Sequence, residues 1–132
     1  MKYFTSEELM NSNTAKRLGI NNWTNDPTIW NNLHALVDNI LDPAREKLGR
    51  PIYVNSGYRS KETNIAVGGA ANSQHTKGEA CDIWCKGDLY ELYRILKEMD
   101  FDQLITYEKK HKNFIHVSYV TYRPNRRMIL HY

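Results

Sequence analysis

The chain has 132 residues, a length that fits one domain with a single hydrophobic core. Its hydrophobic share of 41% and charged share of 25% are typical of a soluble globular protein, and no stretch approaches the roughly 18 apolar residues that a membrane span requires. The net charge of +3 is not accompanied by a run of basic residues, so the sequence does not indicate a nucleic-acid partner.

The first segment, from Met1 to Glu8, lacks the apolar stretch of a signal peptide, so we expect the protein to be made in the cytoplasm without one. Within this segment, Thr5 and Glu8 have the spacing of a capping box, which predicts a short helix directly after Thr5. A second short helix is expected to begin near Ser12 and to run to Gly19.

A long amphipathic helix is expected after Asp26, because Asp is a favoured helix cap and the following Pro suits the first helical position. Its buried side would be formed by apolar residues at helical spacing: Ile29, Trp30, Leu33, Leu36, Val37, Ile40 and Leu41. Pro43 should kink or interrupt this helix, and Gly49 should end the helical segment after the proline. His34 lies on the same helix, where we expect a partly buried structural role.

The second half of the chain is richer in strand and turn signals. Strands are expected at 52–54, 79–84 and, at the end of the chain, about 103–107, 114–120 and 127–131. Helical turns are expected at 61–67 and a helix at 88–99, with a loop of small and polar residues at 68–78. This order predicts a single α+β domain over residues 1–132, with N-terminal helices packed on an antiparallel sheet.

Cys81 and Cys85 both fall near the strand expected at 79–84. Four steps along a strand separate them by about 13 Å, which is too far for a disulfide bond. We therefore expect both thiols to be reduced.

Two polar residues interrupt strands that are otherwise apolar. Asp82 lies between Cys81 and Ile83, and His116 lies between Ile115 and Val117. A carboxylate in such a place is costly unless it is paired, hydrogen-bonded or bound to metal. His75, in the small-residue loop, is free to point toward the same place. Two imidazoles and a carboxylate are a usual catalytic zinc set, although a hydrogen bond between histidine and aspartate would satisfy both groups as well.

The residues around these three positions form a recognisable pattern. Ser73-x-His75-x-x-Gly78-x-Ala80-x-Asp82, followed by Ile115-His116-Val117-Ser118, resembles the M15 family of zinc D-Ala-D-Ala peptidases. The M15A type, which includes bacterial carboxypeptidases and phage-borne cell-wall lysins, is the most similar branch. Further matching segments are Ser56-Gly57-Tyr58-Arg59-Ser60, Asn64 with Val67-Gly68-Gly69, and Asp102-Gln103-Leu104-Ile105. The resemblance implies the hedgehog/DD-peptidase-like fold and one bound Zn²⁺ ion.

The resemblance also implies roles for single residues. His75, Asp82 and His116 match the three zinc ligands. Arg59 matches an arginine that faces the substrate's terminal carboxylate or the scissile carbonyl oxygen, and a guanidinium suits either task.

Two residues compete for the role of general base. His111, five residues before His116, is favoured, and Glu108 is the alternative. Lys109, Lys110 and Lys112 suggest an exposed hairpin here, in which both would be surface residues.

Three further residues adjoin the expected ligands in sequence. Ser73 and Gln74 are expected at the substrate and, with Ser118, are candidates for orienting the imidazoles. In the order of the chain they flank His75 and His116, the two imidazoles that would need fixed orientations.

The implied function is the zinc-dependent hydrolysis of peptide bonds in peptidoglycan stem peptides, as a D-Ala-D-Ala carboxypeptidase or as a cell-wall endopeptidase or endolysin. The sequence leaves open which bond is cut. A monomer that acts on the cell wall, after holin-type release or as part of a phage particle, is expected. The alternative is a zinc-containing module of the same fold that binds cell wall without hydrolysis, or a metal-free structural protein of a phage particle.

Overall fold

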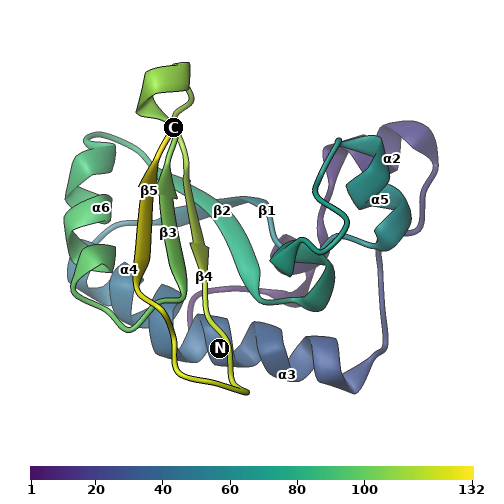
Figure 1. The fold of residues 1–132 in the computed structure, drawn as a ribbon, viewed down its shortest axis with the longest axis horizontal. Helices are drawn as coiled ribbons and strands as arrows, with labels where there is room; N and C mark the ends of the chain where they lie inside the picture. The colour runs from purple at the N-terminus through teal and green to yellow at the C-terminus, as the bar shows by residue number, and fades with distance from the viewer.

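A computed structural model describes residues 1–132 and shows helices in the first part of the chain and a sheet in the second (Figure 1). The α+β architecture expected from the sequence is confirmed. The helical elements are α1 (Ser6–Met10), α2 (Asn13–Leu18), α3 (Pro27–Leu36), the π-helical turn η1 (Val37–Leu41), α4 (Asp42–Leu48), α5 (Lys61–Ala66), the 3-10 turn η2 (Gln74–Lys77), α6 (Leu89–Lys97) and the 3-10 turn η3 (Glu108–Lys110). The strands are β1 (Ile52–Ser56), β2 (Ala80–Cys85), β3 (Gln103–Thr106), β4 (Ile115–Ser118) and β5 (Met128–His131).

The expected helix starts are confirmed, and each has a side-chain cap. The Thr5 hydroxyl accepts from the Glu8 amide while the Glu8 carboxylate accepts from the Thr5 amide, which is the complete capping box. Asp26 accepts from the Thr28 amide at the start of α3. These side chains satisfy amide groups that have no partner within a first helical turn.

Pro43 does not break the long helix, which differs from the expected kink or interruption. The helix runs from α3 through η1 into α4, and Gly49 ends it in the left-handed conformation, with φ of 75°. In the widened turn, the Asp42 amide bonds to the Val37 carbonyl, five residues back. The extra residue lets the helix pass a proline, which has no amide hydrogen and whose ring crowds the preceding turn.

The sheet has the strand order β1-β2-β4-β3-β5, and its first four strands pair antiparallel. The last strand, β5, runs parallel to β3, which a purely antiparallel sheet would not contain. The reason is topological: β3 already occupies the position beside β4. The chain that returns from β4 must therefore pass β3 and pair on its outer edge, in the same direction as β3.

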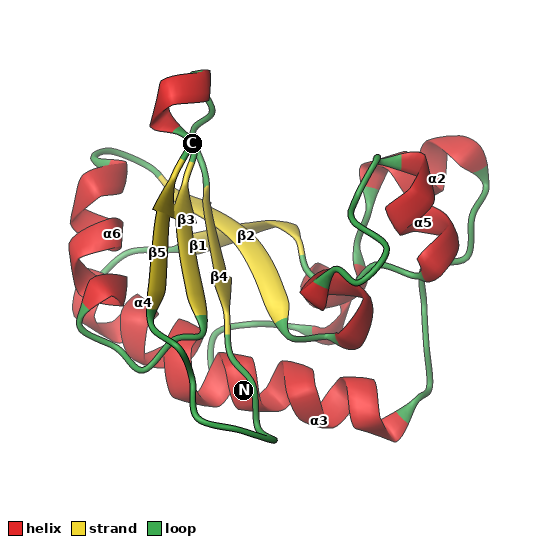
Figure 2. Ribbon diagram, in the orientation of Figure 1, coloured by secondary structure: helices red, strands yellow, loops and turns green.

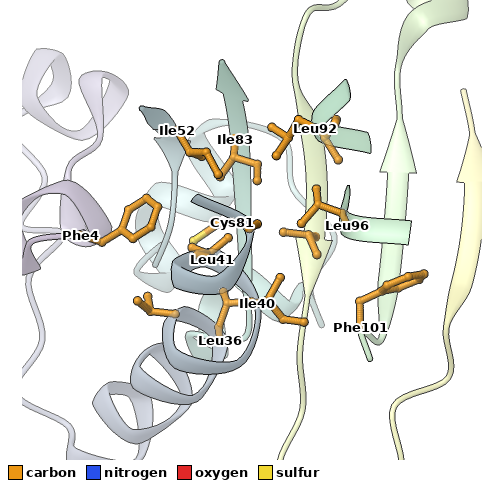
Figure 3. Packing of buried hydrophobic residues seen from close by; sticks show 14 of the residues in the cluster. Phe4, Leu36, Ile40, Leu41, Ile52, Cys81, Ile83, Leu92, Leu96 and Phe101 are labelled. Carbon is orange, nitrogen blue, oxygen red and sulfur yellow. The ribbon is translucent and has the colours of Figure 1, made fainter. Parts of the chain in front are cut away.

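The two faces of the sheet have different surroundings. The ribbon shows α3, α4 and α6 beside the sheet (Figure 2). Ile83 points into the core toward apolar side chains of the long helix and of α6 (Figure 3), and Val117 belongs to the same buried cluster. Cys81 and Cys85 lie on this side too, buried and unpaired as free cysteines, as expected. Because successive side chains alternate along a strand, the residues between them point to the opposite face. None of the helices combines the length and apolar composition that a bilayer crossing needs.

Candidate metal centre

Asp82 and His116 are direct partners in the ladder between β2 and β4. Both point away from the helical core, and each is less than a tenth exposed. Asp82 Oδ1 lies 2.9 Å from His116 Nδ1. The sequence placed these groups on separate strands; the antiparallel register brings them into contact.

His75 reaches the pair from η2, a short 3-10 turn inside a segment that was expected to be loop only. The Ser73 hydroxyl accepts from the His75 amide and caps this turn, and Gly78 ends it in the left-handed conformation. His75 Nδ1 lies 2.8 Å from the carbonyl oxygen of Gly57. Because a carbonyl only accepts, Nδ1 carries a proton, and Nε2 lies 3.4 Å from Asp82 Oδ1.

The three side chains meet the requirements of a zinc site. One ligand atom from each of His75, Asp82 and His116 lies within 4.8 Å of the other two. Tetrahedral zinc, with metal–ligand distances of about 2.1 Å, holds its ligand atoms roughly 3.4 Å apart. The three side chains would therefore need only small shifts to coordinate one ion. Two imidazole nitrogens and one carboxylate oxygen are also the donor chemistry of catalytic zinc, with room for a fourth ligand.

Asp82 is a strongly stabilised anion. Burial raises the pKa of this carboxyl, but hydrogen bonds from His116 and His75 outweigh it and lower the pKa below its usual range. A metal ligand must be deprotonated, so this environment prepares Asp82 for a cation. The carbonyl of Gly57 does the same for His75 by fixing the orientation and tautomer of the ring.

Arg59 lies beside the cluster, as the sequence pattern implied. Its Nη2 lies 3.4 Å from Asp82 Oδ2, and the guanidinium also bonds Ser56 Oγ and Asn64 Oδ1. Burial lowers the pKa of this guanidinium, while Asp82 opposes the change. A side chain at Gly69 would collide with Asn64 Oδ1, so the glycine preserves the support that Asn64 gives to Arg59. A partly buried cation thus faces the same space as the three ligands.

The neighbouring polar residues support the backbone more than the rings. The Ser73 hydroxyl caps η2, and Gln74 donates to Asp102 Oδ2 at 3.0 Å. The Ser118 hydroxyl accepts from the Gln103 amide. Asp102 is fully buried and also binds Arg123 and Arg126, so it ties the loop before β5 to the turn that carries His75. No hydrogen bond joins Ser73, Gln74 or Ser118 to an imidazole of the cluster.

The two candidates for the base lie elsewhere. Glu108 and His111 are exposed in and just after η3, with His111 in the left-handed conformation at φ of 56°. Both line a hollow of about 770 Å³ between the N-terminal end of α6 and the loop that joins β3 to β4. Thr106 and Ile115, which are ladder partners, line it together with Tyr107 and Phe114, so it lies at the η3 end of β3 and β4. The structure does not bring either candidate into the metal cluster.

The remaining histidines also lie outside the cluster. His34 is exposed on α3, in contrast to the partial burial expected from its apolar neighbours. The ring of His131 contacts the Thr106 hydroxyl at 2.6 Å, which is a structural contact between β5 and β3.

Two contributors were not found from the sequence. The Gly57 carbonyl orients His75, and its role depends on backbone geometry that residue identity does not encode. Tyr107 is half-buried, and burial raises the pKa of its hydroxyl, with a further increase from Asp82. Its position on the face of the metal cluster follows from the register of β3.

Comparison with known proteins finds a matching family model and a relative that matches in part. A family model described as Peptidase M15 matches residues 2–118, most of the chain. The protein named zinc D-Ala-D-Ala carboxypeptidase, from Streptomyces albus G, is 48% identical over 44 residues. That stretch covers 33% of this chain and 17% of the relative, so the chain matches only a small part of that protein's length.

Proposed function

The chain belongs to the peptidase M15 family, and from this membership we propose that it hydrolyses peptide bonds of bacterial peptidoglycan with one zinc ion held by His75, Asp82 and His116. The observation that carries the proposal is the convergence of these three side chains, from two strands and a 3-10 turn, within 4.8 Å of one another. The name of the Streptomyces relative supports both the metal and the substrate class.

The roles of the chain's own residues follow from their chemistry. When bound, a zinc ion supplies an electrophile that activates water and polarises a peptide carbonyl. Arg59 provides a second positive charge beside it, pairing with a substrate carboxylate or stabilising the negative charge that develops on the carbonyl oxygen. Asn64 and Ser56 hold the guanidinium in place, so little reorganisation is needed when substrate arrives.

We assign the general base to His111. In this role its imidazole takes a proton from the attacking water and returns it to the leaving amine. His111 lies on an exposed turn outside the cluster, so the turn must fold over the metal when substrate binds. Catalytic contacts are often long in the free enzyme and tighten in the complex. Glu108, on the same turn, is the alternative base.

A specific observation favours a second candidate function. Glu108 and His111 are both exposed and both lie away from the three ligands. A protein with this zinc site but no base in reach would bind stem peptides of the cell wall without cutting them. The placement of Arg59 beside Asp82 is common to both functions, because it serves recognition as well as hydrolysis.

Mass spectrometry of muropeptides after digestion separates the two functions. Purified peptidoglycan is incubated with the zinc-loaded protein, with the metal-free protein, and with the His75→Ala variant. New peptide termini that appear with the zinc-loaded protein alone would support the hydrolase and would identify the bond. Sedimentation of the zinc-loaded protein with intact peptidoglycan, without new termini, would favour the binding module. Neither cleavage nor sedimentation would contradict both functions.

A further inference from the structure

Five aromatic side chains succeed one another across the sheet. Tyr53 and Trp84 are ladder partners on β1 and β2, with ring centroids 4.5 Å apart. Ile83 pairs with Ile115, so the register continued by one step sets Phe114 against Trp84. No ring contact joins Trp84 to Phe114. Ring contacts join Phe114 to Tyr107, at 4.7 Å, and Tyr107 to Tyr132, at 5.9 Å. We call Tyr53, Trp84, Phe114, Tyr107 and Tyr132 the aromatic row.

The aromatic row lies on the same face of the sheet as the metal cluster. Trp84 is two residues after Asp82 on β2, and Phe114 directly precedes β4, two residues before His116. Side chains two apart on a strand share a face and are separated by about 7 Å. The row therefore runs parallel to the line of ligands, at a distance that roughly two residues of an extended peptide would span.

The row is accessible, and its ends are basic. Four of its members are half-buried, and Tyr132 is 44% exposed. The ammonium of Lys86 lies 5.9 Å from the Tyr53 ring, and that of Lys110 lies 5.1 Å from the Tyr132 ring. The core cluster on the opposite face does not include any of the five residues, so the folding of the core does not explain why five flat rings gather here.

We propose that the aromatic row is a subsite for a pyranose ring of the glycan to which the substrate peptide is attached. This inference rests on the proposed function, because it names a part of the same substrate. One face of a pyranose ring presents C–H groups that carry partial positive charge, and the face of an aromatic ring carries partial negative charge. The lysines at the two ends suit the carboxylates of a stem peptide that leads from the sugar to the metal.

The test compares two substrates that share one peptide. One is a muropeptide that carries its disaccharide, and the other is the same stem peptide after removal of the sugar. For the zinc-loaded protein, the ratio of kcat/KM for the first substrate to kcat/KM for the second should be roughly 5 to 10, the factor expected from one additional aromatic contact. A ratio near 1 would overturn the proposal.

Variants show which side chains produce the preference for the substrate that carries the disaccharide. Trp84→Leu keeps an apolar side chain but removes the flat ring, and it should bring the ratio close to 1; Tyr53→Leu should lower it as well and serves if Trp84→Leu does not fold. Tyr90→Leu is the matched control, since Tyr90 is an exposed aromatic residue on α6 and is not a member of the row. A ratio that falls in Tyr90→Leu, and stays high in both row variants, would place the sugar against α6 and overturn the proposal.

Binding of the free disaccharide tests the sugar subsite even if no peptide is cut. NMR of the zinc-loaded protein, titrated with the disaccharide of N-acetylglucosamine and N-acetylmuramic acid, should shift the Trp84 indole signal more than the signals of α6. The absence of such a shift would overturn the sugar subsite. A shift without hydrolysis of either substrate would contradict the hydrolase and leave the subsite supported, so the two failures can be told apart.

Discussion

His75 and Gly57 are joined by a hydrogen bond of 2.8 Å between an imidazole nitrogen and a backbone carbonyl, although 18 residues separate them in the chain. The carbonyl lies in the tight segment that leads from β1 to Arg59. Gly57 has no room for a side chain, because a Cβ there would collide with the Leu9 carbonyl. One backbone group thus orients the His75 ring without any metal, and α1 fixes the position of that group.

His75→Ala should abolish zinc binding at stoichiometric metal and leave a folded protein. The reason is that three ligands are the minimum for a catalytic site, while the buried core on the other face does not depend on them. Metal analysis after gel filtration, with circular dichroism, measures both effects. His34→Ala, at an exposed histidine, should retain one zinc per chain; full zinc content in His75→Ala would contradict the site.

Arg59→Lys should lower kcat/KM by about 10²-fold while zinc content stays full, because an ammonium cannot reproduce the planar fork or its bonds to Ser56 and Asn64. Steady-state kinetics on a stem peptide gives the ratio. Arg50→Lys changes an arginine that pairs with Glu91 away from the metal cluster, and it should keep the activity of the wild type. Equal activity of the two variants would show that the guanidinium is not used.

His111→Ala should lower kcat by about 10²-fold with zinc content unchanged, since removal of a general base costs about 10²–10⁴. Glu108→Gln should change kcat little. Single-turnover kinetics with each variant, at matched zinc content, makes the comparison. The opposite pattern would transfer the role to Glu108, and full activity in both variants would remove the turn from the mechanism.

Glu79→Gln should stabilise the protein at neutral pH by roughly 1 kcal/mol. The Glu79 carboxyl is buried, its Oε1 has no hydrogen-bond partner, and burial raises its pKa. Because the folded state holds its proton at a pH where the unfolded state has lost it, stability falls as pH rises from the ordinary glutamate pKa of about 4.3 toward the raised value.

Urea unfolding at a series of pH values gives the free energy of unfolding for the wild type and for Glu79→Gln. In Glu79→Gln, the free energy of unfolding should no longer fall as pH rises through this range. Glu98→Gln, at an exposed position on the C-terminal side of α6, should match the wild type. A Glu79→Gln variant that is less stable than the wild type at neutral pH would show that the carboxylate is needed.

Asp102→Asn should destabilise the fold by about 3 kcal/mol, because it leaves Arg123 and Arg126 without the buried carboxylate that both bind. Although burial opposes it, hydrogen bonds from Arg126 and Arg123 hold the pKa of Asp102 below its usual range. Its contribution is therefore present above the ordinary pKa of about 3.9 and is lost as pH falls below that value.

Thermal unfolding at pH 7 and in acid checks the prediction for Asp102. The difference between wild type and Asp102→Asn should shrink in acid. Asp100→Asn, two residues earlier and exposed, is the control and should match the wild type at both pH values. A difference that does not depend on pH would mean that shape, and not charge, makes Asp102 important.

The sequence predicted the helix starts, and the convergence of His75, Asp82 and His116, because each depends on local chemistry. Capping residues act within one turn, and a polar residue in an apolar strand stands out without knowledge of its partners. The parallel pairing of β5 could not be predicted in this way, because it depends on which edge of the sheet is free. Contacts between distant backbone groups, such as the Gly57 carbonyl with His75, are also absent from residue patterns.

The position of the expected base also shows that a residue pattern does not determine where a side chain lies in the fold. The family resemblance favoured His111, five residues before His116, as the base, but a position in the sequence does not fix the direction of a side chain once a strand ends. The turn Glu108–Lys110 intervenes, and His111 leaves it in the left-handed conformation. The aromatic row was likewise missed, because its members lie on the five strands or directly beside them, and only the register aligns them.

The π-helical turn at Val37–Leu41 makes the long helix sensitive to the length of the chain in one place. Removal of one residue there would restore ordinary helical winding and rotate everything before it by about 100° relative to α4. Leu33 and Leu36 would then swing out of the core and polar neighbours would swing in. The single extra residue sets the rotation of α3 about the helix axis relative to α4. A one-residue deletion in this turn would therefore be far more harmful than the same deletion in a loop.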